Sequence, residues 1–166
     1  MSRRLGGLVV AITVASLSLY CGVTARNTRL QLHVQVAPDV NDDRPIPVDV
    51  VFVWDKAAAA KLEALTAKDW FDKKAAMRRD DPKEQAFTTR EWEWVPGQEV
   101  PDIDLNVPAA SRKWLRAIFV FANYRTEGPH RAHLSPGSAS IALLRTDFRV
   151  DSPATPAKAG AADKEK

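Results

Sequence analysis

The sequence has a single cysteine, Cys21, among its 166 residues. An intrachain disulfide is therefore excluded, and the fold must depend on an ordinary apolar core. Five Trp and six Phe, together with many Val and Leu, supply enough apolar surface for one domain of roughly 100–120 residues.

Motifs of common catalytic sites are also missing. The sequence contains no Gly-x-Ser-x-Gly elbow and no phosphate-binding glycine loop, and its one cysteine lies near the N-terminus. Asp102 and Asp104 form the one candidate carboxylate pair, which we interpret as the polar face of a strand. We therefore expect no enzymatic activity, no catalytic residue, no cofactor and no small-molecule substrate.

The histidines and carboxylates do not follow a metal-binding pattern. His33 stands alone on the polar face of a predicted strand, and His130 and His133 fall on opposite faces of another. The acidic stretch 37–44 lacks the alternating ligands, central Gly and closing Glu of a calcium loop. We predict no metal site.

Excess positive charge is small once the N-terminus is set aside. The chain has 24 Lys and Arg against 21 Asp and Glu, and removing Arg3 and Arg4 leaves 22 against 21. No block of basic residues with interleaved aromatics is present. Nucleic acid is therefore excluded as a partner.

One long uncharged apolar run is present, Leu5–Tyr20, which follows two arginines and precedes Cys21. This arrangement is typical of an export signal, so residues 1–25 are predicted to be a leader or anchor. Three outcomes are open: acylation of Cys21 after cleavage before it, cleavage after Ala25, or retention as a membrane anchor. Tyr20 is bulky at the position where a lipobox has a small residue.

Beyond the leader, apolar residues recur with the period of two that is typical of half-buried strands. Leu30–Val36 and Val48–Trp54 are predicted to form an antiparallel pair joined by a long polar loop. Further strands are predicted at Phe87–Val95, Ile103–Val107, Trp114–Tyr124 and His130–Leu134. Residues around Ile141 and Phe148 form either one bulged strand or two short ones. Ala117–Ala122 is apolar on both faces, which predicts a strand covered on both sides.

A helical insertion is predicted between the second and third strands. Asp55 and Thr66 are suitable N-caps for helices over Lys56–Leu65 and Ala67–Arg79. Trp92 and Trp94 share a strand face, and we interpret them as packing under this insertion; the alternative is an open aromatic groove for a sugar or peptide.

The pattern as a whole predicts a mainly β fold, a β-sandwich of about seven or eight strands with a helical insertion, over residues 28–151. Residues 152–166 are rich in Pro, Ala and Lys and are predicted to be a disordered tail.

The order of these segments resembles that of a known family, the outer-membrane lipoproteins of type VI secretion systems (TssJ, SciN or VasD). The resemblance covers roughly residues 30–150 as an order of elements. The pieces that carry it are Pro38-Asp39-Val40-Asn41, Pro47-Val48, Ala67-Lys68-Asp69-Trp70-Phe71, Val95-Pro96-Gly97 and Ala117 to Arg125.

This resemblance implies a transthyretin-like β-sandwich on the periplasmic face of the outer membrane, attached through an acylated Cys21. Gly22 occupies the position at which an Asp would favour retention in the inner membrane. The family binds the periplasmic domain of the large inner-membrane secretion protein, TssM, through the loop between the first two strands. Here that loop is Ala37, Pro38, Asp39, Val40, Asn41, Asp42, Asp43 and Arg44.

Other interpretations remain open at this point. An alternative interpretation of the loop is a solvated turn. The location could instead be the periplasm or the inner membrane. The domain could be a periplasmic β-sandwich that binds a small ligand or peptide, or a hydrolase, which would require a concave cluster of convergent polar side chains.

Overall fold

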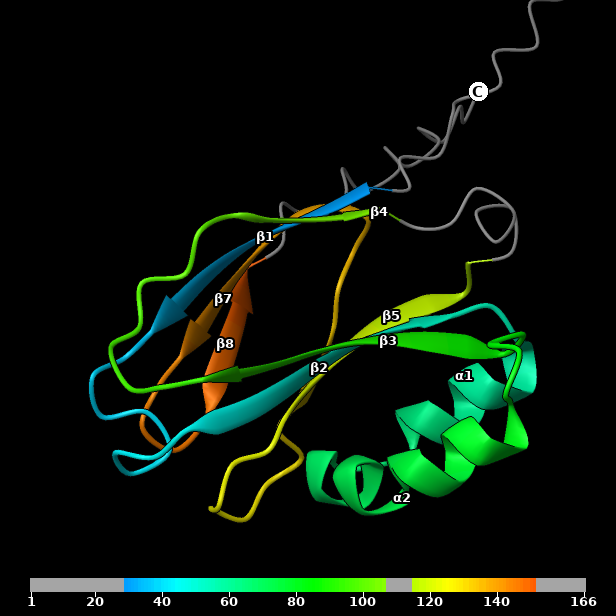
Figure 1. Ribbon diagram of the computed structural model, residues 1–166, viewed down its shortest axis with the longest axis horizontal. Coiled ribbons are helices and arrows are strands. Elements are labelled where there is room, and N and C mark those ends of the chain that lie inside the picture. The colour runs from blue at the N-terminus through cyan, green and yellow to red at the C-terminus, as the bar shows by residue number, and fades with distance from the viewer. Residues whose placement is uncertain (1–28, 107–114, 152–166) are drawn as a thin grey trace, which may run out of the picture.

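The structure is a computed structural model that describes residues 29–106 and 115–151. Within these residues, eight strands form two four-stranded sheets, and two helices cover one sheet (Figure 1). The predicted fold class, a mainly β sandwich with a helical insertion, is confirmed. The predicted leader with Cys21 and the predicted tail lie outside the described residues.

The first sheet has the strand order β4-β1-β7-β8. Its strands are β1 (Arg29–Val36), β4 (Ile103–Asn106), β7 (Gly137–Leu143) and β8 (Phe148–Asp151). β1 pairs in parallel with β7 and antiparallel with β4. Alternation along β1 buries Leu30 and Leu32 completely against the other sheet, while Gln31 and His33 lie on the opposite, polar face.

The second sheet has the order β3-β2-β5-β6, with every neighbouring pair antiparallel. Its strands are β2 (Ile46–Val53), β3 (Phe87–Trp94), β5 (Ala117–Ala122) and β6 (Arg131–His133). β5 contributes to both apolar clusters, the one between the sheets and the one under the helices. The prediction that this strand is covered on both sides is confirmed.

The predicted antiparallel pairing of the first two strands is wrong. β1 and β2 belong to different sheets, and residues 37–45 carry the chain from one layer to the other. A connection of this length permits either arrangement, and the choice depends on β4 and β7, which follow far along the chain. The residues around Ile141 and Phe148 form two separate strands, β7 and β8, and not one bulged strand.

The helices α1 (Lys56–Glu63) and α2 (Ala67–Asp80) form the predicted insertion between β2 and β3. Both predicted N-caps are confirmed, because Asp55 accepts from the amide of Ala58 at 2.8 Å and Thr66 forms a capping box with Asp69. Trp70, fully buried on α2, stacks on Phe121 of β5 with ring centroids 5.3 Å apart. None of the described helices is long and apolar enough to cross a membrane.

The predicted contact between the helices and Trp92 and Trp94 is wrong. Trp94 is 3% exposed and lies in the core between the two sheets, and Trp92 stacks beside it at 5.7 Å. Because faces alternate along β3, it is Phe87 that meets the helices. The burial of Trp94 also removes the open aromatic groove that the pair could have formed.

Candidate functional site

The predicted docking loop, residues 37–44, lies at the end of the sandwich where β1 finishes and β2 begins. The β3–β4 and β7–β8 connections reach the same end of the molecule (Figure 1). The start of β1, at Arg29, lies at the other end of that strand. The loop is therefore separated from the N-terminal side of the domain by the full length of β1.

Three consecutive residues of the loop form a left-handed turn. Asn41, Asp42 and Asp43 have φ of 49°, 53° and 60°, a conformation that Asn and Asp tolerate better than most residues. The amide of Arg44 donates to the carbonyl of Val40 at 3.2 Å, and Val40 is completely buried in the core. The loop is thus a folded turn with its own apolar anchor.

The side chain of Asn41 joins this turn to a neighbouring connection. Its side chain is buried, its Nδ2 donates to the carbonyl of Pro45 at 2.9 Å, and its Oδ1 accepts from the amide of Arg125 at 3.0 Å. Arg125 lies in the β5–β6 connection. A single buried amide therefore fixes both the shape of the turn and its position.

Further bonds attach the loop to the end of β7, to the β7–β8 connection and to the β3–β4 connection. The amide of Ala37 donates to the carbonyl of Leu143 at 2.9 Å, and the amide of Gly97 donates to the carbonyl of Ala37 at 3.1 Å. Gly97, at φ 68°, closes the predicted turn after β3. Arg145 donates to Asp42 at 2.9 Å, and this bond, with the charge of Asp42, raises the pKa of Arg145.

The β5–β6 and β7–β8 connections are bonded to each other as well. Tyr124 donates to the carbonyl of Asp147 at 2.7 Å, and burial raises its pKa. His130, buried, places Nδ1 3.1 Å from the Asp147 carboxylate and Nε2 2.9 Å from the carbonyl of Thr126. The two contacts with Asp147 were not predicted because they join residues 23 and 17 positions apart, beyond any local pattern.

Apolar side chains lie beside the acidic loop. Val95, in the β3–β4 connection, is 50% exposed, and Leu144, after β7, is 36% exposed; they are the large hydrophobic residues exposed in the described part of the chain. Asp39, Asp42 and Asp43 are exposed nearby. We call this set, residues 37–44 with Val95, Leu144 and Arg145, the loop surface. Apolar patches bordered by polar residues are typical of protein contacts.

The other candidate residues do not form a reactive site. Asp102 approaches His33 Nδ1 at 2.6 Å and Asp104 accepts from Arg29 Nε at 3.1 Å, both on the polar face of the first sheet. His133 lies against Glu63 on the surface. Among residues 29–106 and 115–151, no three His, Cys, Asp or Glu side chains gather as a metal site. Cys21 lies outside the described residues.

Comparison with known proteins gives no match to a family model and none to a curated protein sequence. Solved structures do match. The type VI secretion system (T6SS) lipoprotein TssJ1 from Pseudomonas aeruginosa superposes with a TM-score of 0.56 at 16% identity, covering 78% of this chain and 99% of that one. Serratia marcescens Lip, a membrane-bound component of the T6SS, gives 0.54 at 16%, covering 75% and 97%.

A third match is a chain in a structure described as the T6SS protein TssM C-terminal domain from EAEC. Its TM-score is 0.55 at 11% identity, with 75% of this chain and 98% of that chain covered. At such identities the likeness concerns the fold. The chain therefore has the β-sandwich fold of T6SS lipoproteins, and the resemblance found in the sequence is confirmed at the level of the fold.

Proposed function

We propose that the protein is a structural, non-enzymatic lipoprotein of a type VI secretion membrane complex. It is tethered to the periplasmic face of the outer membrane through Cys21, and its loop surface docks a TssM-like periplasmic domain. The observation that carries this proposal is the fold match, which spans 97% or more of each T6SS lipoprotein chain. The predicted export leader ending in Cys21 supports it.

The positions of the tether and the loop suit this role. Cys21 precedes Arg29 by eight residues, which span at most about 28 Å when extended. β1 then runs from Arg29 to Val36, about 25 Å, and ends at the loop surface. A domain held by Cys21 can thus present its loop surface away from the membrane, because the loop surface lies at the opposite end of β1 from Arg29.

The rigidity of the loop also supports docking over the alternative of a solvated turn. Asn41 and Val40 are buried, and backbone bonds attach Ala37 to both neighbouring connections. A loop fixed before binding loses little conformational entropy in the complex, which improves affinity. Exposed Val95 and Leu144 supply apolar area, and the three aspartates supply a charge pattern that orients a basic partner.

Charge reversal tests this function. Replacing Asp42 and Asp43 together by Lys is expected to weaken binding of the TssM-like periplasmic domain from the same organism by about tenfold or more, measured by calorimetry. Both side chains are exposed, so the domain should keep its circular dichroism spectrum. Because Lys suits the left-handed φ of these two positions less well than Asp, we expect a small fall in the melting temperature. Asp80→Lys, an exposed reversal at the end of α2, is the matched control. Equal affinity of the double variant and wild type would remove the loop surface from the interface.

A further inference from the structure

The four edge strands of the sandwich differ greatly in length. β4 and β8 have 4 residues each and β6 has 3, whereas β3 has 8. Short edge strands are one way in which proteins prevent unwanted pairing. Among the described strands, β3 is therefore the long edge that a further strand could extend.

The outward backbone groups of β3 follow from its register with β2. The amide of Trp54 donates to the carbonyl of Ala86 at 2.9 Å at the end of this ladder. Because such bonds alternate in an antiparallel pair, Thr89, Glu91 and Glu93 direct their backbone groups away from β2. Within the described residues, hydrogen bonds to this side come from side chains only: Asp81 accepts from Phe87, and Arg90 donates to Thr89.

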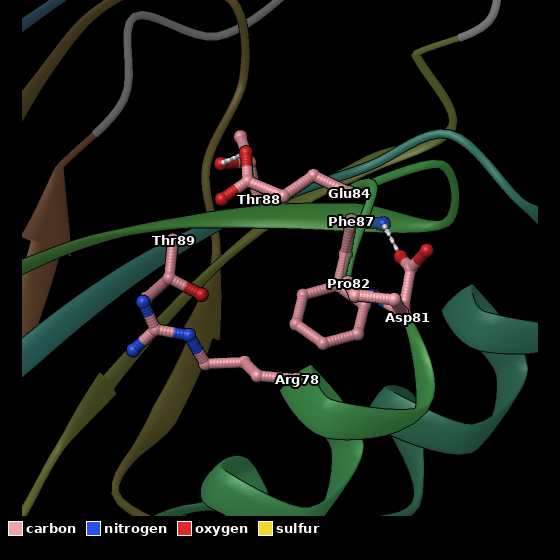
Figure 2. Close-up of a pocket in the computed structure, with 7 residues that line it drawn as sticks. All are labelled: Arg78, Asp81, Pro82, Glu84, Phe87, Thr88 and Thr89. Carbon is pink, nitrogen blue, oxygen red and sulfur yellow. Dashed lines mark hydrogen bonds between the residues drawn. The ribbon is translucent and has the colours of Figure 1, made fainter.

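Two hollows follow this edge on the side of α2. The first, of about 190 Å³, lies between the end of α2 and the start of β3 (Figure 2). It is lined by Arg78, Asp81, Pro82, Glu84, Phe87, Thr88 and Thr89. The second, of about 290 Å³, is lined by Pro47, Asp49, Lys74, Glu91, Trp92 and Glu93. Glu91, paired with Lys74 and Arg78, lies between them along the strand.

Each hollow contains a polar group that lacks a partner. In the first, Thr89 Oγ1 is buried and is the buried side-chain oxygen without a hydrogen bond in the described structure. Figure 2 shows Thr89 at the side of the hollow where the Arg78 guanidinium lies. In the second, Glu93 is exposed and forms no ion pair with any described residue. The two lie four residues apart on one face of β3.

We propose that the outer edge of β3 pairs with an extended segment of a partner protein. A Ser, Thr, Asn or Gln of that segment bonds Thr89, and a Lys or Arg four residues along the same face pairs with Glu93. Backbone bonds supply affinity in such strand addition, and side-chain pockets supply specificity. Four residues of an added strand span about 13 Å, which matches the separation of Thr89 from Glu93 along β3.

The charges of β3 favour a basic partner over a second copy of this chain. The two registers that pair most of β3 with a second copy oppose Arg90 to Arg90 or Glu91 to Glu91, and like charges directly opposite are unfavourable. A register centred on Thr89 avoids this repulsion but pairs fewer residues. The β3 edge is distinct from the loop surface, so this inference does not depend on the proposed function.

A short peptide provides the test. The probe is acetyl-Lys-Val-Thr-Glu-Thr-Thr-Val-amide, which places Lys opposite Glu93 and Thr opposite Thr89 in an antiparallel pair. Titrated into the full chain in detergent, it is expected to bind below about 1 mM and to slow amide exchange at Thr89, Glu91 and Glu93. Glu93→Lys is expected to weaken binding about tenfold and to favour the peptide in which Glu replaces the Lys. Asp80→Lys is the matched control.

Three results would overturn the inference: no binding up to about 1 mM, binding that the Glu93→Lys exchange leaves unchanged, or protection of a different strand. Dimerisation in analytical ultracentrifugation that Glu93→Lys abolishes would also overturn it, since the edge would then belong to a second copy. The variant with Asp42 and Asp43 replaced by Lys should bind the peptide as wild type does, which separates this outcome from that of the loop surface.

Discussion

Asp49 is a charged residue in the layer between α2 and the second sheet, with 1% of its surface exposed. It accepts from Trp70 Nε1 at 2.8 Å and from Lys74 Nζ at 2.8 Å. Burial raises the pKa of Asp49 even though both bonds oppose the shift. Burial also acts to lower the pKa of Lys74, but its bonds to Asp49 and Glu91 outweigh this and raise it. The buried negative charge of Asp49 is thus stabilised mainly by the positive charge of Lys74.

Lys74→Met should therefore destabilise the domain strongly, by about 3–5 kcal/mol, because it leaves a buried carboxylate without its cation. Urea denaturation would measure the loss. The control is Lys68→Met, which removes an exposed i,i+4 pair with Asp72 and should change stability by less than about 1 kcal/mol. Similar losses for both variants would contradict this view of Asp49. Adding Asp49→Asn to Lys74→Met should recover part of the loss.

Little of this residue-scale chemistry could be predicted. The period of two along Val48–Trp54 predicts that Asp49 and Val51 lie on the face away from Val48 and Val50, and the structure has this arrangement. The identity of its partners depends on where α2 crosses the sheet, and no spacing within the sequence specifies that. The same applies to Asn41, whose acceptor bond joins it to Arg125, 84 positions later.

At the scale of the element, α2 contains a testable pH dependence in its first turn. Hydrogen bonds from Lys73 and Thr66 lower the pKa of Asp69 from 3.8 to about 2. A carboxyl whose pKa is lower in the folded state adds stability at pH values above its unfolded pKa. That contribution is lost as the pH falls through the window from about 4 to about 2.

Thermal unfolding of wild type and Asp69→Asn at pH 5, 4, 3 and 2 would reveal this contribution. Other carboxylates titrate in both proteins, so the informative quantity is the difference between the two melting temperatures. We expect wild type to be more stable at pH 5 and the difference to shrink steadily towards pH 2. A difference that stays constant over the four pH values would show that the Asp69 carboxylate is not the source.

Elements were predicted better than their partners. Both helix starts were correct because caps are local signals, carried by Asp55 and Thr66. The pairing of β1 with β2 was wrong because periodicity specifies which face of a strand is buried and not which strand lies beside it. Trp92 and Trp94 show the same limit: their burial was predicted correctly, but the layer predicted to cover them, the helices, is wrong.

At the scale of the whole molecule, the proposed attachment through Cys21 can be tested directly. We expect wild type to incorporate labelled palmitate and to sediment with the outer membrane. If the proposed attachment is correct, Cys21→Ser should lose the label and the outer-membrane association, because Cys21 is the one cysteine in the sequence. Soluble wild type would indicate cleavage after Ala25 instead. If neither the wild type nor the variant is labelled and both remain in the inner membrane, the N-terminal segment is retained as an anchor.

The parallel contact between β1 and β7 has a consequence for the order in which the chain folds. Leu30 pairs with Gly137, 107 positions later, and on its other side with Leu105, 75 positions later. A chain that emerges N-terminus first therefore presents β1 long before either partner exists, and contacts of such wide separation form slowly. During that interval the sandwich cannot close, so the domain stays unfolded until its last strands are available.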